Sequence, residues 1–302
     1  MARTRERGFP PSPEPLPAPV VDNHTHLESI AGVLPDDVAD PGIAGHLSRA
    51  EAVGVRALVQ IGCDLDSAAV SVAMAAEHRQ VLAGVAIHPN EAVLHAGVRE
   101  IAPDGLEPDP APRHDRGLDE AIEQIAELAR ADRVRTVGET GLDYFRAGPE
   151  GRAVQRESFR GHIALAKELG LPLQIHDREA HADVLEVLAA DGAPEVTVFH
   201  CFSGDAEMAA ECVRRGYYLS FAGSVTFRNA HEVRRAAIET PLSHVLVETD
   251  APYLTPHPWR GRPNAPYVLA DTVRALAEAK EADLTEVCSA VDGNAESLYG
   301  PW

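Results

Sequence analysis

Short apolar runs alternate along this chain with longer stretches in which apolar positions recur at helical spacing. The apolar runs are rich in Val, Leu and Ile, residue types that favour β-strands. The stretches between them are rich in Ala, Leu, Glu and Arg, as amphipathic helices are. Such alternation predicts a parallel sheet covered by helices. We expect strands at 20–23, 57–62, 82–87, 134–139, 171–176, 196–200, 217–221 and 245–250.

Eight strand and helix units are the number that closes a parallel barrel. The length of 302 residues accommodates one such barrel, which typically takes about 250 residues. An open, doubly wound sheet is the alternative, but no G-x-G-x-x-G motif follows the first predicted strand. We therefore predict an α/β fold, a single TIM-type (β/α)8 barrel that occupies residues 20–302.

Two segments lie outside this pattern. Residues 1–19 contain many prolines and few large apolar residues, so we predict a Pro-rich tail that is disordered or extended. Residues 96–117 combine prolines with charged side chains and predict an irregular loop insertion. This insertion falls between the third predicted strand and the helix that precedes the fourth.

The charge and cysteine content limit the function classes. Lys and Arg together number 27 against 47 Asp and Glu, a formal net charge of −20 that repels nucleic acid at long range. A polyanionic substrate would therefore need bound cations or a local group of arginines. The four cysteines form no C-x-x-C pair, and no apolar run approaches the ~18 residues of a membrane span. We expect a cytoplasmic protein with neither a membrane association nor an obligate protein partner.

Residues of the types that bind metals stand at the ends of five predicted strands. In a barrel these ends converge on the face that carries active sites. The two histidines after the first strand are two positions apart, so their side chains share one face. An unpaired buried carboxylate costs several kcal/mol, and Glu139 needs a metal or, in the simpler alternative, an arginine. The candidate ligands are His24, His26, Glu139, His176, His200 and Asp250.

This ligand set is larger than one catalytic metal site uses. Imidazole and carboxylate groups together suit zinc, manganese or a related divalent ion. Six ligands are too many for one ion with an open position, and enough for two ions that share a carboxylate. A single histidine at a strand end is usually a hydrogen-bonded core residue, but six ligand-type residues at the same end are not explained in that way. We predict two divalent ions (Zn, Mg or Mn).

The motifs that carry these residues resemble those of the TatD family of metal-dependent deoxyribonucleases, within the amidohydrolase-like barrels. The resemblance extends from residue 20 to residue 300. It implies that Glu139 bridges two ions, and that His24, His26 and Asp250 hold one of them while His176 and His200 hold the other. The matching motifs include D-N-H-T-H-L at 22–27, G-V-A-I-H-P at 84–89, G-E-T-G-L-D-Y at 138–144, H-C-F-S-G at 200–204 and L-V-E-T-D-A-P-Y-L-T-P at 246–256.

The function that we predict is metal-dependent hydrolysis of phosphodiester bonds in DNA, as an exonuclease that acts on single strands or ends. Glu139 and Asp250 are the predicted catalytic residues. Asp250 is expected to orient a water and accept its proton, with a plain metal ligand as the alternative. Asp22 and Asp143 are expected to orient the metal ligands. The candidate substrate-binding residues are Arg178, His88, Arg228, Arg260 and Arg262.

Three alternatives remain open at this point. Arg178 can pair with Asp183 or Glu179 instead of binding a phosphate. The same two ions can serve an amidohydrolase or an aminoacyl-ester hydrolase, although the carboxylated lysine usual at the fourth strand of amidohydrolases is replaced here by Glu139. The only lysines, Lys167 and Lys280, fall in predicted helices. A non-catalytic binding protein is the third alternative, which the complete ligand set disfavours.

Overall fold

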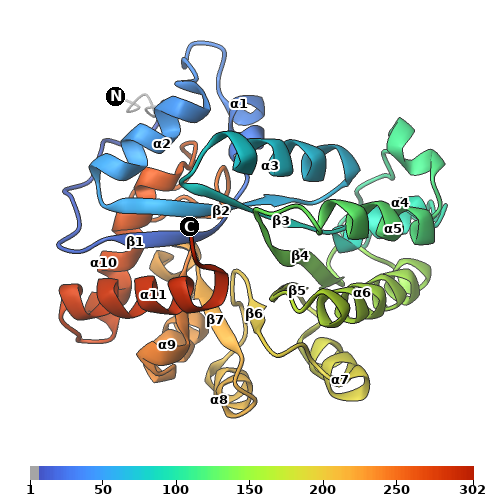
Figure 1. Cartoon of the computed structure of the whole chain (residues 1–302). Helices are drawn as coiled ribbons and strands as arrows, with labels where there is room; N and C mark the ends of the chain where they lie inside the picture. Colours follow the sequence, from blue (N-terminus) through green and yellow to red (C-terminus); the bar gives the residue numbers. More distant parts are fainter. Residues whose placement is uncertain (1–6) are drawn as a thin grey trace. The chain divides into compact units, whose positions relative to one another are not determined.

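The computed structural model describes residues 7–302, in which eight parallel strands alternate with helices along the chain in the order β1 to β8 (Figure 1). This is the strand order of a (β/α)8 barrel, and the predicted fold class is confirmed. No helix of residues 7–302 is both long and apolar enough to cross a membrane.

The chain divides into two compact units, and each is described separately. The first unit consists of the described residues up to Gln60 together with Gly204–Val213 and Leu219–Trp302. Within it, β1 pairs with β2 and β7 pairs with β8, both in parallel. Its elements are β1 (Val20–Thr25), η1 (Leu27–Ser29), α1 (Ile30–Val33), α2 (Gly42–Ala52), β2 (Val55–Gly62), α8 (Ala206–Arg214), β7 (Tyr218–Phe221), η3 (Gly223–Thr226), α9 (His231–Glu239), η4 (Leu242–His244), β8 (Val245–Val247), η5 (Pro266–Val268), α10 (Leu269–Ala279) and α11 (Leu284–Tyr299).

The second unit consists of Ile61–Ser203 and Arg214–Tyr218. Four of its strands, β3 to β6, form consecutive parallel pairs. Its elements are α3 (Leu65–Glu77), β3 (Val81–Val85), α4 (Pro89–His95), η2 (Pro112–Asp115), α5 (Leu118–Leu128), β4 (Val134–Asp143), α6 (Pro149–Leu169), β5 (Leu173–Arg178), α7 (His181–Asp191) and β6 (Thr197–Phe199).

Helix α6 shows how the helical periodicity becomes packing in the second unit. Phe159, Ile163 and Ala166 recur three or four residues apart and are buried, so they form one apolar stripe against the sheet. Each large side chain buried in this way contributes about 1.5–3 kcal/mol. The helix stops at Gly170, whose φ of 63° is the left-handed conformation that glycine adopts without strain.

Strand β4 is longer than predicted, and this difference matters for the site. The sequence predicts that the strand stops at Glu139, whereas β4 continues to Asp143. It continues because residues 140–143 pair in register with residues 175–178 of β5. At Gly141, with φ 142°, a Cβ would lie 2.1 Å from the carbonyl oxygen of His176, so only glycine lets the two strands approach there.

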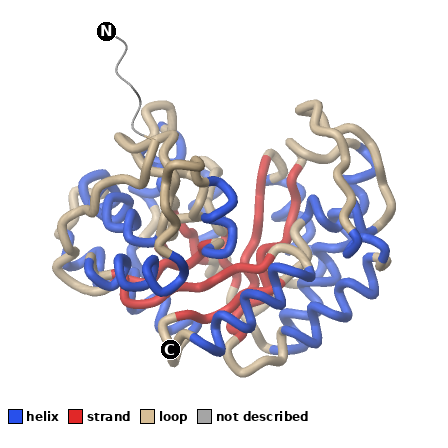
Figure 2. Tube along the Cα trace, turned by 90° about the horizontal axis from the view of Figure 1, so that it is seen from above, coloured by secondary structure: helices blue, strands red, loops and turns tan. Residues whose placement is uncertain are grey.

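Residues 7–19 form an extended segment without helix or strand, drawn as loop in Figure 2. Of the two predicted states of the tail, disordered or extended, residues 7–19 adopt the extended one. Leu16 is buried, and its backbone N–H donates to the carbonyl of Val53 at 3.0 Å. Arg274 donates to the carbonyls of Glu14 and Pro15 at 2.8 and 2.9 Å. The side chain of Arg274 thus satisfies two carbonyls of a segment that belongs to no strand. The rest of the predicted tail, 1–6, lies outside the described residues.

The predicted insertion at 96–117 is irregular except for the short helix η2. Two side chains of η2 fix it to α4: Arg113 and His114 each donate to the carboxylate of Glu91, at 2.8 Å. The Nδ1 atom of His114 accepts the backbone N–H of Ala111, so the proton of the neutral ring lies on Nε2, where it donates to Glu91. The insertion is therefore held by ordinary hydrogen bonds.

Candidate metal centre

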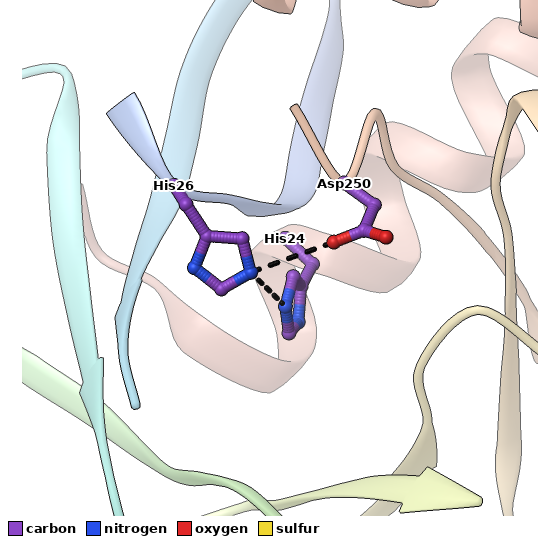
Figure 3. Close-up of side chains that lie close together, drawn as sticks. All are labelled: His24, His26 and Asp250. Atoms are coloured by element: carbon purple, nitrogen blue, oxygen red, sulfur yellow. Dashed lines mark hydrogen bonds and ion pairs between the residues drawn. The ribbon is translucent and has the colours of Figure 1, made fainter. Parts of the chain in front are cut away.

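His24, His26 and Asp250, which we call the His24 group, form a compact set of ligand-type side chains in the first unit (Figure 3). His24 and His26 lie two residues apart at the end of β1, which is buried along its whole length. Their Nε2 atoms are 3.2 Å apart, and the Nε2 atom of His26 is 3.4 Å from Oδ1 of Asp250. Both distances are dashed in the figure, where the three side chains point toward one another.

These separations fit a metal ion. Ligand atoms about 2.0–2.1 Å from a zinc ion, at a tetrahedral angle, lie about 3.3 Å from one another. The spacing within the His24 group matches this value, and the donor set of two imidazoles and one carboxylate is that of a catalytic site with an open position. The His24 group can therefore hold a divalent ion with a coordination position left for water or substrate.

The backbone at Asp250 is arranged to present its carboxylate. Asp250 has φ 52°, in the left-handed region that aspartate tolerates better than most residues. Its N–H donates to the carbonyl of His24 at 2.9 Å, and its own carbonyl accepts the N–H of Tyr253 at 2.8 Å. These bonds hold the turn after β8 directly against the end of β1, and so keep Asp250 beside the two histidines.

Asp22 holds the same turn through hydrogen bonds to Thr249. It is fully buried and accepts hydrogen bonds from the backbone N–H of Thr249 at 2.9 Å and from the Thr249 hydroxyl at 2.5 Å. Burial raises the pKa of Asp22 to about 8, although the hydrogen bonds from Thr249 act in the opposite direction. Asp22 lies two residues before His24 in β1. Its predicted role, to orient the ligands, stays a prediction.

Replacement of Asp22 by alanine is expected to lower the free energy of unfolding by about 1–3 kcal/mol, because two buried donors of Thr249 lose their acceptors. Urea denaturation in the presence of a chelator measures this effect without a contribution from bound metal. Asp22→Asn keeps one acceptor and adds a donor, so it should cost less than Asp22→Ala. Equal losses for the two variants would contradict the hydrogen-bonding role.

The second unit contains another set of ligand-type side chains, His88, Glu139, His176 and His200, which we call the Glu139 group. The carboxylate oxygen Oε2 of Glu139 is 2.8 Å from Nε2 of His200 and 3.0 Å from Nδ1 of His176. The same oxygen is 3.9 Å from Nε2 of His88. One carboxylate oxygen thus faces three imidazoles, an arrangement that suits a cation in their midst.

The orientation of the Glu139 side chain depends on an irregularity in β4. The register of β4 against β5 shifts between Val137 and Thr140, so residues 138–139 form a bulge in the ladder. Bulges of this kind turn a side chain away from the regular alternation of a strand and are frequent next to active sites. The side chain of Glu139, which lies in this bulge, faces His176 and His200.

The electrostatics of the Glu139 group keep its carboxylate ionised. Burial raises the pKa of Glu139, but the electrostatic interactions with His200 and His88, which act where Glu139 titrates, and hydrogen bonds from His176 and His200 outweigh it and hold this pKa well below its usual range. Burial lowers the pKa of His176, yet hydrogen bonds to Asp143 and Glu139 reverse the effect and raise it to about 9. Burial lowers the pKa of His88 to about 4. The group is therefore built around one negative charge.

Asp143 and Asn90 hold His176 from the side opposite Glu139. Oδ2 of Asp143 is 3.4 Å from Nε2 of His176 and accepts from the side-chain amide of Asn90 at 3.1 Å. Asn90 also donates its backbone N–H to Nδ1 of His88 at 3.1 Å, which fixes the tautomer of that ring. Asp143 thus contacts His176, and its predicted orienting role stays a prediction. Asn90, which donates to Asp143, is a residue that the sequence prediction missed.

Cys63 is a second residue that the prediction missed. Its Sγ atom lies 3.2 Å from Oε1 of Glu139. Cys63 directly follows the last residue of β2, so the strand-end rule that identified the histidines applies to it as well. A thiolate is a soft ligand that favours zinc over magnesium, which makes Cys63 a candidate for the choice of metal.

The candidate substrate-binding residues occupy different environments. His88 belongs to the Glu139 group, where its Nε2 atom lies 3.9 Å from Oε2 of Glu139. Arg178 is exposed, and its guanidinium stacks on the ring of Phe145 at 3.9 Å. In the first unit, exposed Arg260 stacks on Phe227 at 4.4 Å. Exposed Arg228 and half-buried Arg262 are the remaining members of this set. Their substrate contacts stay predictions.

The structure thus brings together three of the six predicted ligands in the His24 group and the other three in the Glu139 group. Each group lies within one unit. The prediction that Glu139 bridges two ions joins residues of both units and stays a prediction. The number and identity of the ions stay predictions too.

Comparisons with known proteins agree on the family. The model of the TatD related DNase family matches residues 21–300. A metal-dependent hydrolase TatD of Mycobacterium tuberculosis, described as uncharacterized, is 43% identical over 285 residues, which cover 93% of this chain and 98% of the relative. The hydrolase YabD of Bacillus subtilis, described in the same way, is 35% identical over 92% of this chain and 98% of its own length.

Among solved structures, the TatD homologue YjjV of Escherichia coli is similar to this chain with a TM-score of 0.77 and 25% identity. The similarity covers 93% of this chain and 98% of YjjV. Both chains are therefore alike over nearly their whole length, and the predicted resemblance is confirmed in sequence and in fold.

Proposed function

Because the chain belongs to the TatD related DNase family of metal-dependent hydrolases, we propose that it hydrolyses phosphodiester bonds of DNA, as an exonuclease acting on single strands or ends. The observation that carries this proposal is the His24 group, in which two imidazoles and a carboxylate are spaced as ligands of one divalent ion and leave a position open. Esters of phosphoric acid suit such a centre, because their negatively charged oxygens are attracted to the metal ion.

In sites of this kind, divalent ions activate water near neutral pH and neutralise charge on phosphoryl oxygens. Asp250 is the residue of this chain that is placed to accept the proton of the water. Its carboxylate is 14% exposed and lies 3.4 Å from Nε2 of His26, so it is held on one side and accessible on the other. The hydrogen bond from its N–H to His24 keeps this orientation.

Substrate charge must be balanced by local cations, because the net charge of −20 repels DNA. We assign this role to arginines with exposed or half-buried guanidinium groups, which bind phosphate through paired donors. Arg178 supports the assignment. Its guanidinium stacks on Phe145, and none of the ion pairs of the described residues joins it to Asp183 or Glu179. Asp183 is instead paired with Arg156 at 2.7 Å.

The lysines of this chain do not support the amidohydrolase that carries a carboxylated lysine. Lys167 lies in α6 and donates to the carbonyl of Asp191 at 2.9 Å, and Lys280 follows α10 and donates to the carbonyl of Ala237 at 2.7 Å. Both ammonium groups therefore donate to backbone carbonyls. An amide or aminoacyl-ester substrate remains the alternative to be tested.

The test is hydrolysis of single-stranded oligodeoxynucleotides labelled at the 3′ or the 5′ end. Protein treated with a chelator is expected to be inactive, and addition of Mg²⁺, Mn²⁺ or Zn²⁺ is expected to restore shortening of the strand from one end. The retained label gives the polarity. If elemental analysis finds bound metal but no ion supports cleavage, the nuclease proposal is wrong, and aminoacyl-ester and amide substrates are assayed next.

A further inference from the structure

The first unit contains a cavity of about 460 Å³ beside the turn that follows β8. Its size is in the range of small-molecule sites, about 300–1,000 Å³. Pro252 and Tyr253 line one part of it, and Arg260 and Arg262 line another. Arg7, from the segment before β1, lines it as well. This residue lies outside the part of the chain, 21–300, that matches the family model.

The segment before β1 also determines where Arg262 lies. The Nε atom of Arg262 donates to the carbonyl of Gly8 at 2.7 Å, and its Nη2 atom donates to the carbonyl of Phe9 at 2.5 Å. The hydroxyl of Tyr267 donates to the carbonyl of Pro10. Phe9 packs with its ring edge against His46, 5.6 Å between centroids. Residues 8–10 are therefore anchored to the first unit, in part through Arg262, which lines the cavity.

The cavity is rich in positive charge. Arg7, Arg260 and Arg262 bring three guanidinium groups to its lining. Among the ion pairs of residues 7–302, none joins Arg7 or Arg260 to a carboxylate, and both side chains are exposed. In a chain of net charge −20, this group of cations makes the potential locally positive and so favours an anion at the cavity. Guanidinium groups are suited to phosphate.

The cavity adjoins the His24 group through Tyr253. The ring of Tyr253 lines the cavity and also lies edge-on to the ring of His26, 6.4 Å between centroids. Tyr253 is 53% exposed, which is high for an aromatic side chain, and aromatic rings at nucleic-acid sites stack on bases. Tyr253 therefore lies between the cavity that it lines and the metal ligand His26.

We propose that residues 7–10 are part of the substrate site, in that they position Arg262 and add Arg7 to a cavity which binds a phosphate next to the one that is hydrolysed. This inference rests on the proposed function for the identity of the substrate. The cavity itself and its charge do not depend on that function. The segment before β1 is then a specificity-determining part of the protein that is absent from the matched family region.

The experiment compares thymidine trinucleotides in which the diester next to the scissile one is charged or is replaced by a neutral methylphosphonate, on either side. For the metal-loaded wild type, the neutral replacement on one side is expected to raise KM about tenfold, the loss of one charged hydrogen-bonded contact. Arg7→Ala is expected to bind both trinucleotides alike, since it lacks the partner of that charge. Arg262→Lys keeps a charge but loses the guanidinium donors to Gly8 and Phe9, so it is expected to discriminate less than the wild type does. Arg274→Ala is the control, because it releases the same segment at Glu14 and Pro15, outside the cavity lining.

Calorimetric titration of the same trinucleotides measures binding independently of hydrolysis. Loss of discrimination in Arg7→Ala, with discrimination kept in Arg274→Ala, supports the inference. If Arg7→Ala discriminates as the wild type does while DNA is hydrolysed, the inference is wrong and the proposed function stands. If the wild type binds and discriminates but does not hydrolyse any trinucleotide, the cavity assignment stands and the nuclease proposal fails.

Discussion

Glu139→Gln is expected to lower kcat/KM for oligonucleotide hydrolysis by at least about 10³-fold, with most of the bound metal lost. The carboxylate oxygen of Glu139 faces His176, His200 and His88, and an amide there leaves three imidazoles without their anion. Charge stabilisation by a catalytic metal is worth several kcal/mol, and about 1.4 kcal/mol corresponds to a factor of ten in rate. The measurement combines steady-state kinetics with elemental analysis of the purified protein.

Glu91→Gln is the matched control for this variant. Glu91 accepts from Nε2 of His114 at 2.8 Å, the distance that separates Glu139 from His200, and it lies in the same unit. Its hydrogen-bond partners, Arg113 and His114, hold the insertion, and it acts on His88 of the Glu139 group only through its charge. Glu91→Gln should therefore reduce stability while activity and metal content stay close to those of the wild type. A comparable loss of activity in both variants would indicate a folding defect instead of a catalytic role.

Asp250→Asn is expected to lower kcat by about 10²–10⁴-fold, the range that a positioned proton acceptor contributes, with little change in KM. Asparagine keeps the size of the side chain and one oxygen toward His26, but it cannot accept a proton from water. Metal content distinguishes this role from plain ligation. If occupancy stays high while kcat falls, Asp250 is the proton acceptor; if occupancy and kcat fall in proportion, it acts only as a ligand.

Asp40→Asn serves as the control for Asp250→Asn. Oδ1 of Asp40 lies 3.1 Å from Nε2 of His46, an aspartate and histidine contact of the same kind in the same unit. His46 packs against Phe9, so this control also reports whether disturbing α2 affects the segment before β1. Unchanged kcat is expected. A kcat that falls as far as in Asp250→Asn would contradict the assignment of Asp250.

The strand-end residues were predictable because they depend on two regular periods. Alternation of strands and helices places strand ends together, and the two-residue period of a strand puts His24 and His26 on one face. Both rules work from sequence alone. They also extend to Cys63, which follows β2 in the same way and lies beside Glu139.

The orientation of Glu139 was not predictable in this way. It depends on a bulge in β4, and the bulge depends on how residues 140–143 pair with β5, a contact between segments distant in sequence. The apolar pattern identified the strand and not its length. For the same reason the sequence predicts that the strand stops at Glu139, whereas it continues to Asp143.

The contacts that hold residues 7–19 could not be predicted from the composition of this segment. A run of prolines indicates that a segment cannot form a core of its own, but it carries no information about carbonyl acceptors supplied to distant donors. Arg262 reaches the carbonyl of Gly8 across 254 positions of sequence. Sequence patterns with short periods do not contain such pairs.

The prolines of residues 10–19 have one more consequence, which concerns conformational entropy. Each proline ring fixes φ, so the unbound segment already samples few backbone conformations, mostly extended ones. Ordering it against the first unit therefore removes less chain entropy than ordering a segment of ordinary residues would. A few hydrogen bonds to Gly8, Phe9, Pro10, Glu14 and Pro15, with one buried leucine, suffice to hold it.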